Sequence, residues 1–455
     1  MLYIHDAFVY TKSWINKWEQ KGRYLMKLLM LGWELPPHNS GGLGVACFQM
    51  AKALADEGAD IDFVLPYKAD HSEADKFMNV ISASDVPPAV DENGNYIAMG
   101  AYSGNCIWCG GDRKCRHARA YGKGFVAATH QYADKVENMV RHDNMQPSII
   151  HAHDWLTMEA GVRAKSATGS PLVVHVHATE FDRAGGHSGN PLIHDIEYFG
   201  MQAADRIFAV SQITKDIIVS NYGIPADKIE VVHNSIDPNE LSHVSLETDN
   251  YLYIKKMQQL GYKIVVNIGR LTVQKGLSYL VEAAALAISK NPKLIFVISG
   301  SGELRDQLIE LAADLGISDR VIFTGFIRGI RFRELYEIAD MFVMPSISEP
   351  FGLTPLEAAY YDTAILLSKT CGVGEVLNNA LRFDYWDTRK LADQIVGVSL
   401  SPALHSSLVE GVKAEYLNCN WGDVARKLLG QYNRVIANHK RSRRSGHKKE
   451  VKSRG

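Results

Sequence analysis

Short apolar runs separated by helical patterns recur along the whole chain, and this alternation limits the possible folds more than any other feature. In the first half, the strand candidates are Leu28 to Trp33, Ile61 to Leu65, Ser148 to His151, Leu172 to His175 and Arg206 to Ser211. In the second half, they are Lys263 to Ile268, Leu294 to Ser299, Val321 to Thr324, Met341 to Met344 and Ala364 to Leu367. Such runs alternate with helices in parallel βαβ units. The pattern predicts an α/β protein with two Rossmann-like sheets.

Composition agrees with a two-domain globular protein. The chain has 455 residues, of which 46% are hydrophobic and 22% are charged, and this length normally divides into two domains. It has six cysteines, no cationic segment leading into an apolar one, and no apolar run of about 18 residues. We therefore expect a cytoplasmic protein without disulfides or a transmembrane segment.

The chain divides into five expected parts. Residues 1–25 form an N-terminal extension without clear periodicity, 26–245 the first domain and 246–420 the second. Residues 421–438 form a final helix, because apolar side chains recur along one face of it. Residues 439–455 carry eight Lys or Arg and one Glu, which predicts a disordered, solvated extension rather than a nucleic-acid site.

A Gly/Pro-rich loop with two carboxylates follows the apolar run at residues 341–344. Glu349 and Glu357 lie eight residues apart in it. Thr354 suits an N-cap and Pro355 the first turn, so a helix should begin there, and its free N–H groups favour phosphate. The alternative is that Glu357 only closes a capping box with Thr354 and that Glu349 is a solvated charge.

Two cations follow the first strand of the second half. Arg270 and Lys275 lie between Gly269 and Gly276, and a guanidinium with an ammonium on a glycine-flanked loop suits a diphosphate. Together with the glutamate pair, this order of motifs resembles the C-terminal half of the retaining GT-B glycosyltransferases of group 1 (family 4/5 type), which include glycogen and starch synthases.

The resemblance implies a GT-B fold, in which two Rossmann-like domains face an interdomain cleft and the final helix crosses back to the first domain. In the first domain, Gly41 and Gly42 would let the backbone approach a ligand. A dinucleotide-binding fingerprint is the competing interpretation, but that motif requires Gly or Ala at the position where this chain has Cys47. Bacterial and plant glycogen synthases have Lys-Thr where this chain has Asn39 and Ser40, so a preference for ADP-glucose is in doubt.

The segment from His151 to Trp155 reads His-Ala-His-Asp-Trp. Two histidines and an aspartate suggest a metal, but no further convincing ligand is spaced nearby, and we expect none. By resemblance, Asp154 lies near the donor sugar and His177 holds it, while His175 is a core residue. Glu180, Asp182 and Arg183 follow in a loop that suits an acceptor, or they are surface charges.

The resemblance also assigns roles in the second domain. Arg270 and Lys275 would neutralise the leaving diphosphate, Glu349 would hold sugar hydroxyls and Glu357 the ribose. The remaining substrate-binding candidates are Gly302 beside the nucleotide, Phe326 and Ile327 at the base, and Gly352, Leu353 and Thr354 in the glutamate loop.

The activity implied is transfer of glucose from UDP- or ADP-glucose to an α-1,4-glucan, as in glycogen synthase, without a cofactor. The same motifs occur in sucrose- or trehalose-forming synthases and in transferases that build envelope glycans. A non-catalytic glycan-binding GT-B protein is the alternative outside enzymes. The sequence leaves the donor base, the acceptor and the oligomeric state open.

A cysteine-rich segment falls where the resemblance is weak. Cys106, Cys109, Cys115 and His117 could form a zinc knuckle, but the second pair is spaced more tightly than usual. We expect reduced cysteines in this loop.

Overall fold

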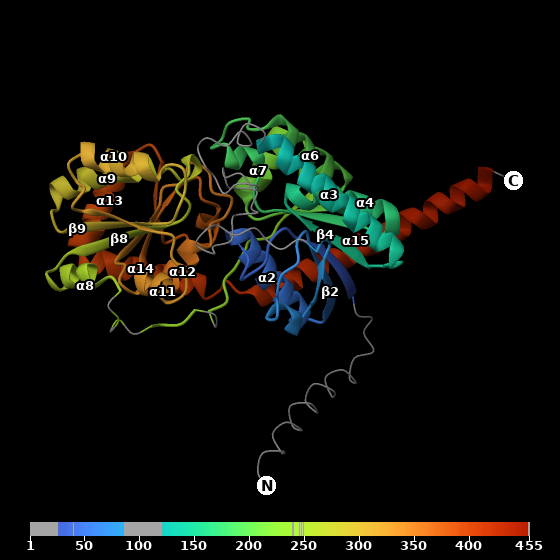
Figure 1. Ribbon diagram of the computed structural model, residues 1–455, viewed down its shortest axis with the longest axis horizontal. Coiled ribbons are helices and arrows are strands. Elements are labelled where there is room, and N and C mark those ends of the chain that lie inside the picture. The colour runs from blue at the N-terminus through green and yellow to red at the C-terminus, as the bar shows by residue number, and fades with distance from the viewer. Residues whose placement is uncertain are drawn as a thin grey trace, which may run out of the picture.

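The protein folds into two α/β domains that lie side by side (Figure 1). The computed structural model describes residues 26–39, 41–85, 121–238, 241–244, 246, 248 and 250–453, without the side chains of 121–125 and 443–453. The expected extension at 1–25 and the cysteine-rich segment at 106–117 lie outside the described residues.

The first domain is built on a seven-stranded parallel sheet in the order β3-β2-β1-β4-β5-β6-β7. Its strands are β1 Met26–Leu31, β2 Ala59–Leu65, β3 Asn79–Ser82, β4 Ile149–His153, β5 Leu172–Val176, β6 Arg206–Ala209 and β7 Ile229–Val231. Its helices are α2 Gly42–Asp56, α3 Tyr121–His142, α4 Trp155–Thr168, α5 Glu180–Arg183, α6 Pro191–Ala203 and α7 Gln212–Tyr222. One face of the sheet packs on α3, α4 and α6, and the other on α2.

The second domain has a six-stranded parallel sheet in the order β10-β9-β8-β11-β12-β13. Its strands are β8 Lys263–Ile268, β9 Leu294–Ser299, β10 Val321–Gly325, β11 Met341–Met344, β12 Ala364–Ser368 and β13 Leu381–Phe383. Its helices are α8 Leu252–Gln259, α9 Leu277–Lys290, α10 Arg305–Asp314, α11 Ile330–Glu337, α12 Thr354–Tyr360, α13 Thr388–Leu400 and α14 Pro402–Tyr416. Helices cover both faces, so the strands are apolar on both sides.

All ten predicted strands are present, and the prediction of two Rossmann-like sheets is confirmed. Strands β3, β7 and β13 were not predicted; they are three or four residues long, and each lies at a sheet edge. It also placed the first strand two residues late, since β1 spans Met26–Leu31. Short strands with partly exposed faces lack the continuous apolar run that marks a central parallel strand.

The final helix, α15 (Trp421–Ser453), packs on the first domain. Its buried residues join the core of α2 and the sheet, and the Tyr432 hydroxyl lies 2.8 Å from Nδ1 of His151. Figure 1 shows α15 running beneath the first domain and projecting beyond it. The helix continues past the predicted end at residue 438 to Ser453, and Lys and Arg are good helix formers.

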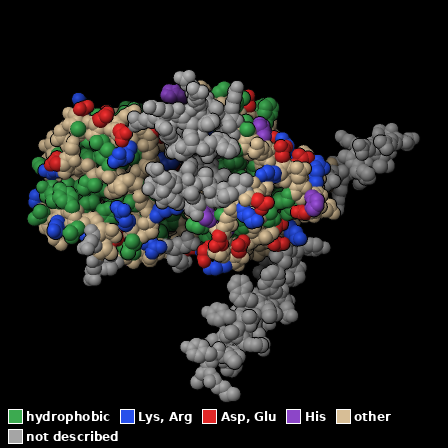
Figure 2. All heavy atoms as spheres, viewed as in Figure 1, with side chains coloured by type: hydrophobic (Ala, Val, Ile, Leu, Met, Phe, Trp, Pro, Cys, Tyr) green, Lys and Arg blue, Asp and Glu red, His purple; other side chains and the backbone are tan. Residues whose placement is uncertain are grey.

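Acidic and basic side chains are interspersed on the face of both domains that Figure 2 shows. Within the described residues, no single helix is long and apolar enough to cross a membrane. Two consecutive helical segments, Thr388–Leu400 and Pro402–Ser442, together have the length and composition of a membrane span, but the chain bends by 103° between them.

Candidate active site

The carboxyl ends of the two sheets face each other, as three contacts between the domains show. Ser348, after β11, donates to Oδ1 of Asp182, after β5, at 2.6 Å. Arg328, after β10, donates to the carbonyl of Asn39, after β1, at 2.7 Å. Glu375, after β12, accepts the N–H of Gln212, after β6, at 2.8 Å. In open parallel sheets, ligands bind at this end of the strands, so the candidate site lies between these loops.

The loop after β8 is fixed to the loop after β11. Gln274 donates to the carbonyl of Ser348 at 3.0 Å and accepts from Arg270 at 3.2 Å. Gly276 has φ +63°, and a Cβ atom there would lie 2.2 Å from the carbonyl oxygen of Pro345. Only glycine allows this approach, so the spacing of the two loops depends on it.

This approach brings Lys275 and Glu349 into direct contact through Nζ and Oε2. The two side chains are only 17% and 10% exposed, and Glu349 also accepts from Ser346 at 3.2 Å. Arg270, Lys275 and Glu349 were predicted to share one site, and the structure brings the two loops that carry them together. Glu349 is thus an ion-pair partner rather than the solvated charge of the alternative.

The start of α12 differs from the prediction. Leu353, not Thr354, is the N-cap, and its carbonyl accepts the N–H of Leu356 at 2.9 Å and of Glu357 at 3.1 Å. The helix therefore begins one residue earlier than a Thr354 cap would allow, and no capping box forms. Glu357 instead accepts from the Tyr336 hydroxyl at 2.9 Å. Burial raises the pKa of Glu357 to about 7, although the Tyr336 hydrogen bond lowers it.

The loop before α12 reaches the glycine turn of the first domain. Gly352 has φ +94° and lies against Met344. Leu353 contacts the hydrophobic cores of both domains, and its Cδ1 lies 3.7 Å from where a Cβ atom of Gly42 would be. Gly41 is the N-cap of α2 in an extended conformation. The glycine pair and the glutamate loop are therefore neighbours.

The other second-domain candidates follow β9 and β10. A Cβ atom at Gly302 would lie 2.3 Å from the carbonyl oxygen of Leu271, so this turn packs directly on the arginine loop. Phe326 is 49% exposed, whereas Ile327 is buried. The Arg328 guanidinium lies 4.9 Å from the centre of the Phe326 ring.

In the first domain, Asp154 joins the ends of β4 and β5. It is fully buried with φ +58°, and its Oδ1 accepts the N–H groups of His177 at 2.6 Å and Ala178 at 3.3 Å. Nε2 of His177 lies 3.1 Å from Nδ1 of His153. Burial lowers the pKa of His177, while Asp154 raises it, so the net effect favours a neutral ring.

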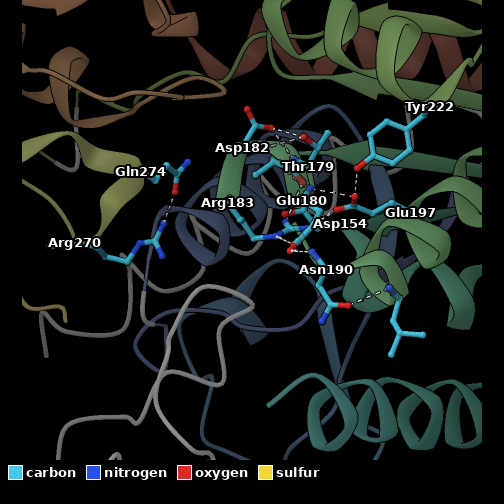
Figure 3. A network of polar contacts seen from close by, with 12 residues as sticks. Asp154, Thr179, Glu180, Asp182, Arg183, Asn190, Glu197, Tyr222, Arg270 and Gln274 are labelled. Carbon is cyan, nitrogen blue, oxygen red and sulfur yellow. Dashed lines mark hydrogen bonds and ion pairs between the residues drawn. The ribbon is translucent and has the colours of Figure 1, made fainter. Parts of the chain in front are cut away.

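The charged side chains of Glu180, Asp182 and Arg183 after β5 are buried, so the alternative of surface charges is wrong. Figure 3 shows how these side chains lie together. Thr179 and Asp182 form a capping box around α5, and Arg183 pairs with Glu180 at 2.9 Å and with Glu197. Burial raises the pKa of Glu197 to about 7 against the effect of Arg183. The three-residue spacing of Thr179 and Asp182 could have indicated the box.

Four other residues of the site belong to no recognisable sequence motif. Glu197, Tyr222, Gln274 and Ser348 are single polar residues that enter the site by contacts across long stretches of sequence. None of the four was predicted as a site residue.

Comparisons with known proteins agree with this geometry. Residues 111–240 match the family model "Glycosyltransferase Family 4", and residues 254–396 match "Glycosyl transferases group 1". An uncharacterized glycosyltransferase of Methanocaldococcus jannaschii, MJ1607, is 29% identical over 90% of this chain and 98% of its own. Glycogen synthase of Mycobacterium tuberculosis is 26% identical over 78% of this chain and 80% of its own.

A solved structure gives the same fold. Sucrose-phosphate synthase from Thermosynechococcus elongatus superimposes with a TM-score of 0.69 at 18% identity, covering 90% of this chain and 99% of that one. The fold and the site thus define a GT-B glycosyltransferase, an enzyme that transfers a hexosyl group. Within that class, residues 254–396 match the group 1 glycosyltransferases, and a match to the family 4 model at residues 111–240 precedes them. The expected fold class and the expected resemblance are confirmed.

Proposed function

We propose that this protein is a retaining glycosyltransferase that transfers glucose from UDP- or ADP-glucose to an α-1,4-glucan, as glycogen synthase does. The observation that carries the proposal is the contact of Lys275 with Glu349, which holds a cation and a carboxylate together beside Arg270. The similarity to a glycogen synthase over 78% of the chain supports the same substrate class.

In this proposal, protein cations offset the charge of the leaving diphosphate. Arg270 can offer its planar guanidinium and Lys275 its ammonium to phosphate oxygens. These contacts strengthen as negative charge develops on the departing group, so they lower the barrier more than they improve binding. Gly302, Gly352, Leu353 and Thr354 are the proposed neighbours of the nucleotide, with Phe326 and Ile327 at the base. Glu357 is the proposed acceptor of hydrogen bonds from the ribose.

The sugar would lie between the Lys275–Glu349 pair and the strand ends of the first domain. When Lys275 turns to the diphosphate, Oε2 of Glu349 becomes available to a sugar hydroxyl. His177, Asp154 and the turn at Gly41 and Gly42 would shape the opposite side.

The proposed transfer needs no covalent intermediate between the sugar and the enzyme. The bond from the sugar C1 to the diphosphate oxygen breaks and a bond from C1 to the acceptor oxygen forms on the same face. The acceptor proton passes to the departing diphosphate. An oxocarbenium-like transition state connects the two, and no residue is assigned as a nucleophile.

The test is nucleotide release from UDP-glucose and ADP-glucose with glycogen, maltodextrin, glucose or glucose phosphates as acceptor, followed by determination of the new linkage. We expect release with one of the two donors and a glucan, giving an α-linked product. A β-linked product would exclude retention. Release only with a sugar phosphate would favour the sucrose- or trehalose-type alternative, and glycan binding without release from any donor would favour the non-catalytic one.

A further inference from the structure

Four histidines line one face of the first sheet at the carboxyl ends of two neighbouring strands. His151 and His153 alternate along β4, and His175 and His177 lie at the end of β5, with His153 paired to His175 in register. Alternate residues of a strand point to the same face. The rings lie close together: the centroids of His151 and His153 are 4.2 Å apart, and those of His175 and His177 are 4.4 Å apart.

Three of these rings are fully buried with unused nitrogen atoms. His151, His153 and His175 each have 0% exposure. Nε2 of His151, Nε2 of His153 and both ring nitrogens of His175 have no hydrogen-bond partner among the described residues. A buried polar atom without a partner costs about 1–3 kcal/mol. Earlier positions on the same face, Ile149 and Val173, are apolar, so three histidines here call for a compensating ligand.

Ring nitrogens of the three histidines lie close together. One ring nitrogen from each of His151, His153 and His175 lies within 4.8 Å of the other two. Nitrogens bound to one tetrahedral zinc lie about 3.4 Å apart, given Zn–N distances of about 2.0–2.1 Å. Small side-chain rotations can close this difference.

The surroundings prepare the rings as ligands. The Tyr432 hydroxyl contacts Nδ1 of His151 at 2.8 Å, and His177 contacts Nδ1 of His153 at 3.1 Å. In both rings this leaves Nε2 available, as in metal sites whose outer partners fix the ring orientation. Burial lowers the pKa of His151 to about 3 and lowers the pKa values of His153 and His175 as well. The rings are therefore neutral, which is the form that binds metals.

A second possible set is less suitable. Cys47, His153 and His177 also lie within reach of one another. However, His153 and His177 already use a nitrogen each in their mutual hydrogen bond, and burial raises the pKa of the Cys47 thiol. Binding by His151, His153 and His175 breaks no hydrogen bond within the described part of the chain, because Nε2 of His151 and His153 is not used in one.

We propose that His151, His153 and His175 bind one Zn²⁺ ion, with a water molecule as fourth ligand. Imidazole nitrogen suits zinc among the common divalent ions. The ion would join the ends of β4 and β5, directly before Asp154 and His177. Its role would be to position these two residues, and it takes no part in the proposed chemistry. The sequence alone did not predict a metal here, because the third ligand is not near His151 along the chain but lies on the adjacent strand.

The test uses the full chain without a histidine tag, equilibrated with Zn²⁺ and freed of excess metal, with zinc measured by mass spectrometry. We expect roughly one zinc per chain in the wild type and at least tenfold less in His175→Phe, which keeps a ring of similar shape without ligand atoms. His71→Phe is the matched control, because His71 is also buried and its Nε2 has no partner in the described part of the chain. It should retain the zinc, as should the Cys106→Ser/Cys109→Ser double variant.

Thermal unfolding gives a second readout. Zinc should raise the midpoint of the wild type and of both controls but not that of His175→Phe. If His175→Phe does not fold, His151→Phe takes its place. Less than about a tenth of a zinc per wild-type chain would overturn the proposal whatever the variants do. Zinc kept by His175→Phe and lost from the double cysteine variant would place the metal elsewhere and overturn it too.

Discussion

The two domains meet at the site with opposite chemistry. The second domain presents a partly accessible charged pair, Lys275 and Glu349, beside Arg270. The first domain presents buried histidines around Asp154, whose carboxylate is tied to backbone N–H groups. A cation and a carboxylate that are partly accessible can exchange partners during a reaction, whereas a buried carboxylate held by backbone N–H groups keeps one geometry. We infer that the second domain handles developing charge and that the first domain fixes position.

The largest expected effect is loss of charge in the second domain. Arg270→Ala and Lys275→Ala should each lower turnover by about 3 kcal/mol, or about a hundredfold, with a smaller change in donor affinity. The reason is that the cations contact the diphosphate most strongly as it departs. Steady-state kinetics with donor titration measures both quantities.

The control is Lys290→Ala on the same domain, which removes an exposed lysine paired with Asp393 and should leave both quantities unchanged. If instead Arg270→Ala and Lys275→Ala weakened donor binding without lowering turnover, the cations would stabilise the bound donor and not the transition state. The inference that the second domain handles developing charge would then be wrong.

The next largest effect is expected in the first domain. Asp154→Asn replaces a carboxylate that accepts two buried N–H groups, and hydrogen bonds to charged groups contribute about 1.5–3 kcal/mol each. Asparagine tolerates the positive φ at this position, so the backbone should hold. We expect unfolding free energy to fall by roughly 2 kcal/mol and turnover to fall with it, both measurable by urea denaturation and kinetics.

Asp195→Asn, at a mostly exposed side chain in the same domain, is the control and should change neither. A variant of Asp154 with unaltered stability but abolished turnover would show that the residue acts in the chemistry rather than in positioning.

A smaller effect should separate binding from chemistry at Glu357. Glu357→Gln should raise the donor KM several-fold with little change in kcat, because a ribose contact changes little during reaction. The ionised carboxylate is the better acceptor and the pKa of Glu357 is raised by burial to about 7. Donor KM should therefore fall as pH rises from about 6 to about 8 in the wild type and stay flat in the variant. An equal pH dependence in both would exclude Glu357 as the titrating group.

How much the sequence could predict differs between fold and site. Central strands such as β8 and β11 are continuous apolar runs, and the loops after them carry Arg270, Lys275 and Glu349 at recognisable spacing. The missed strands β3, β7 and β13 are too short for such a pattern. Gln274 and Ser348 are hydrogen-bonded to each other although they lie 74 residues apart in the sequence. The histidines of β4 and β5 come together only because the two strands pair. Such contacts depend on the tertiary structure, so no periodic pattern in the sequence indicates them.

The account's central claim is that protein cations, and not a divalent ion, offset the charge of the diphosphate. The most direct test is the turnover of the wild-type enzyme with its preferred donor and acceptor in excess EDTA, compared with turnover in Mg²⁺ or Mn²⁺. The account predicts no loss of rate in EDTA that Mg²⁺ or Mn²⁺ restores, because Arg270 and Lys275 supply the positive charge; a loss that only Zn²⁺ restores would reflect the proposed positioning ion instead. Activity that disappears in EDTA and returns on addition of Mg²⁺ or Mn²⁺ would contradict it.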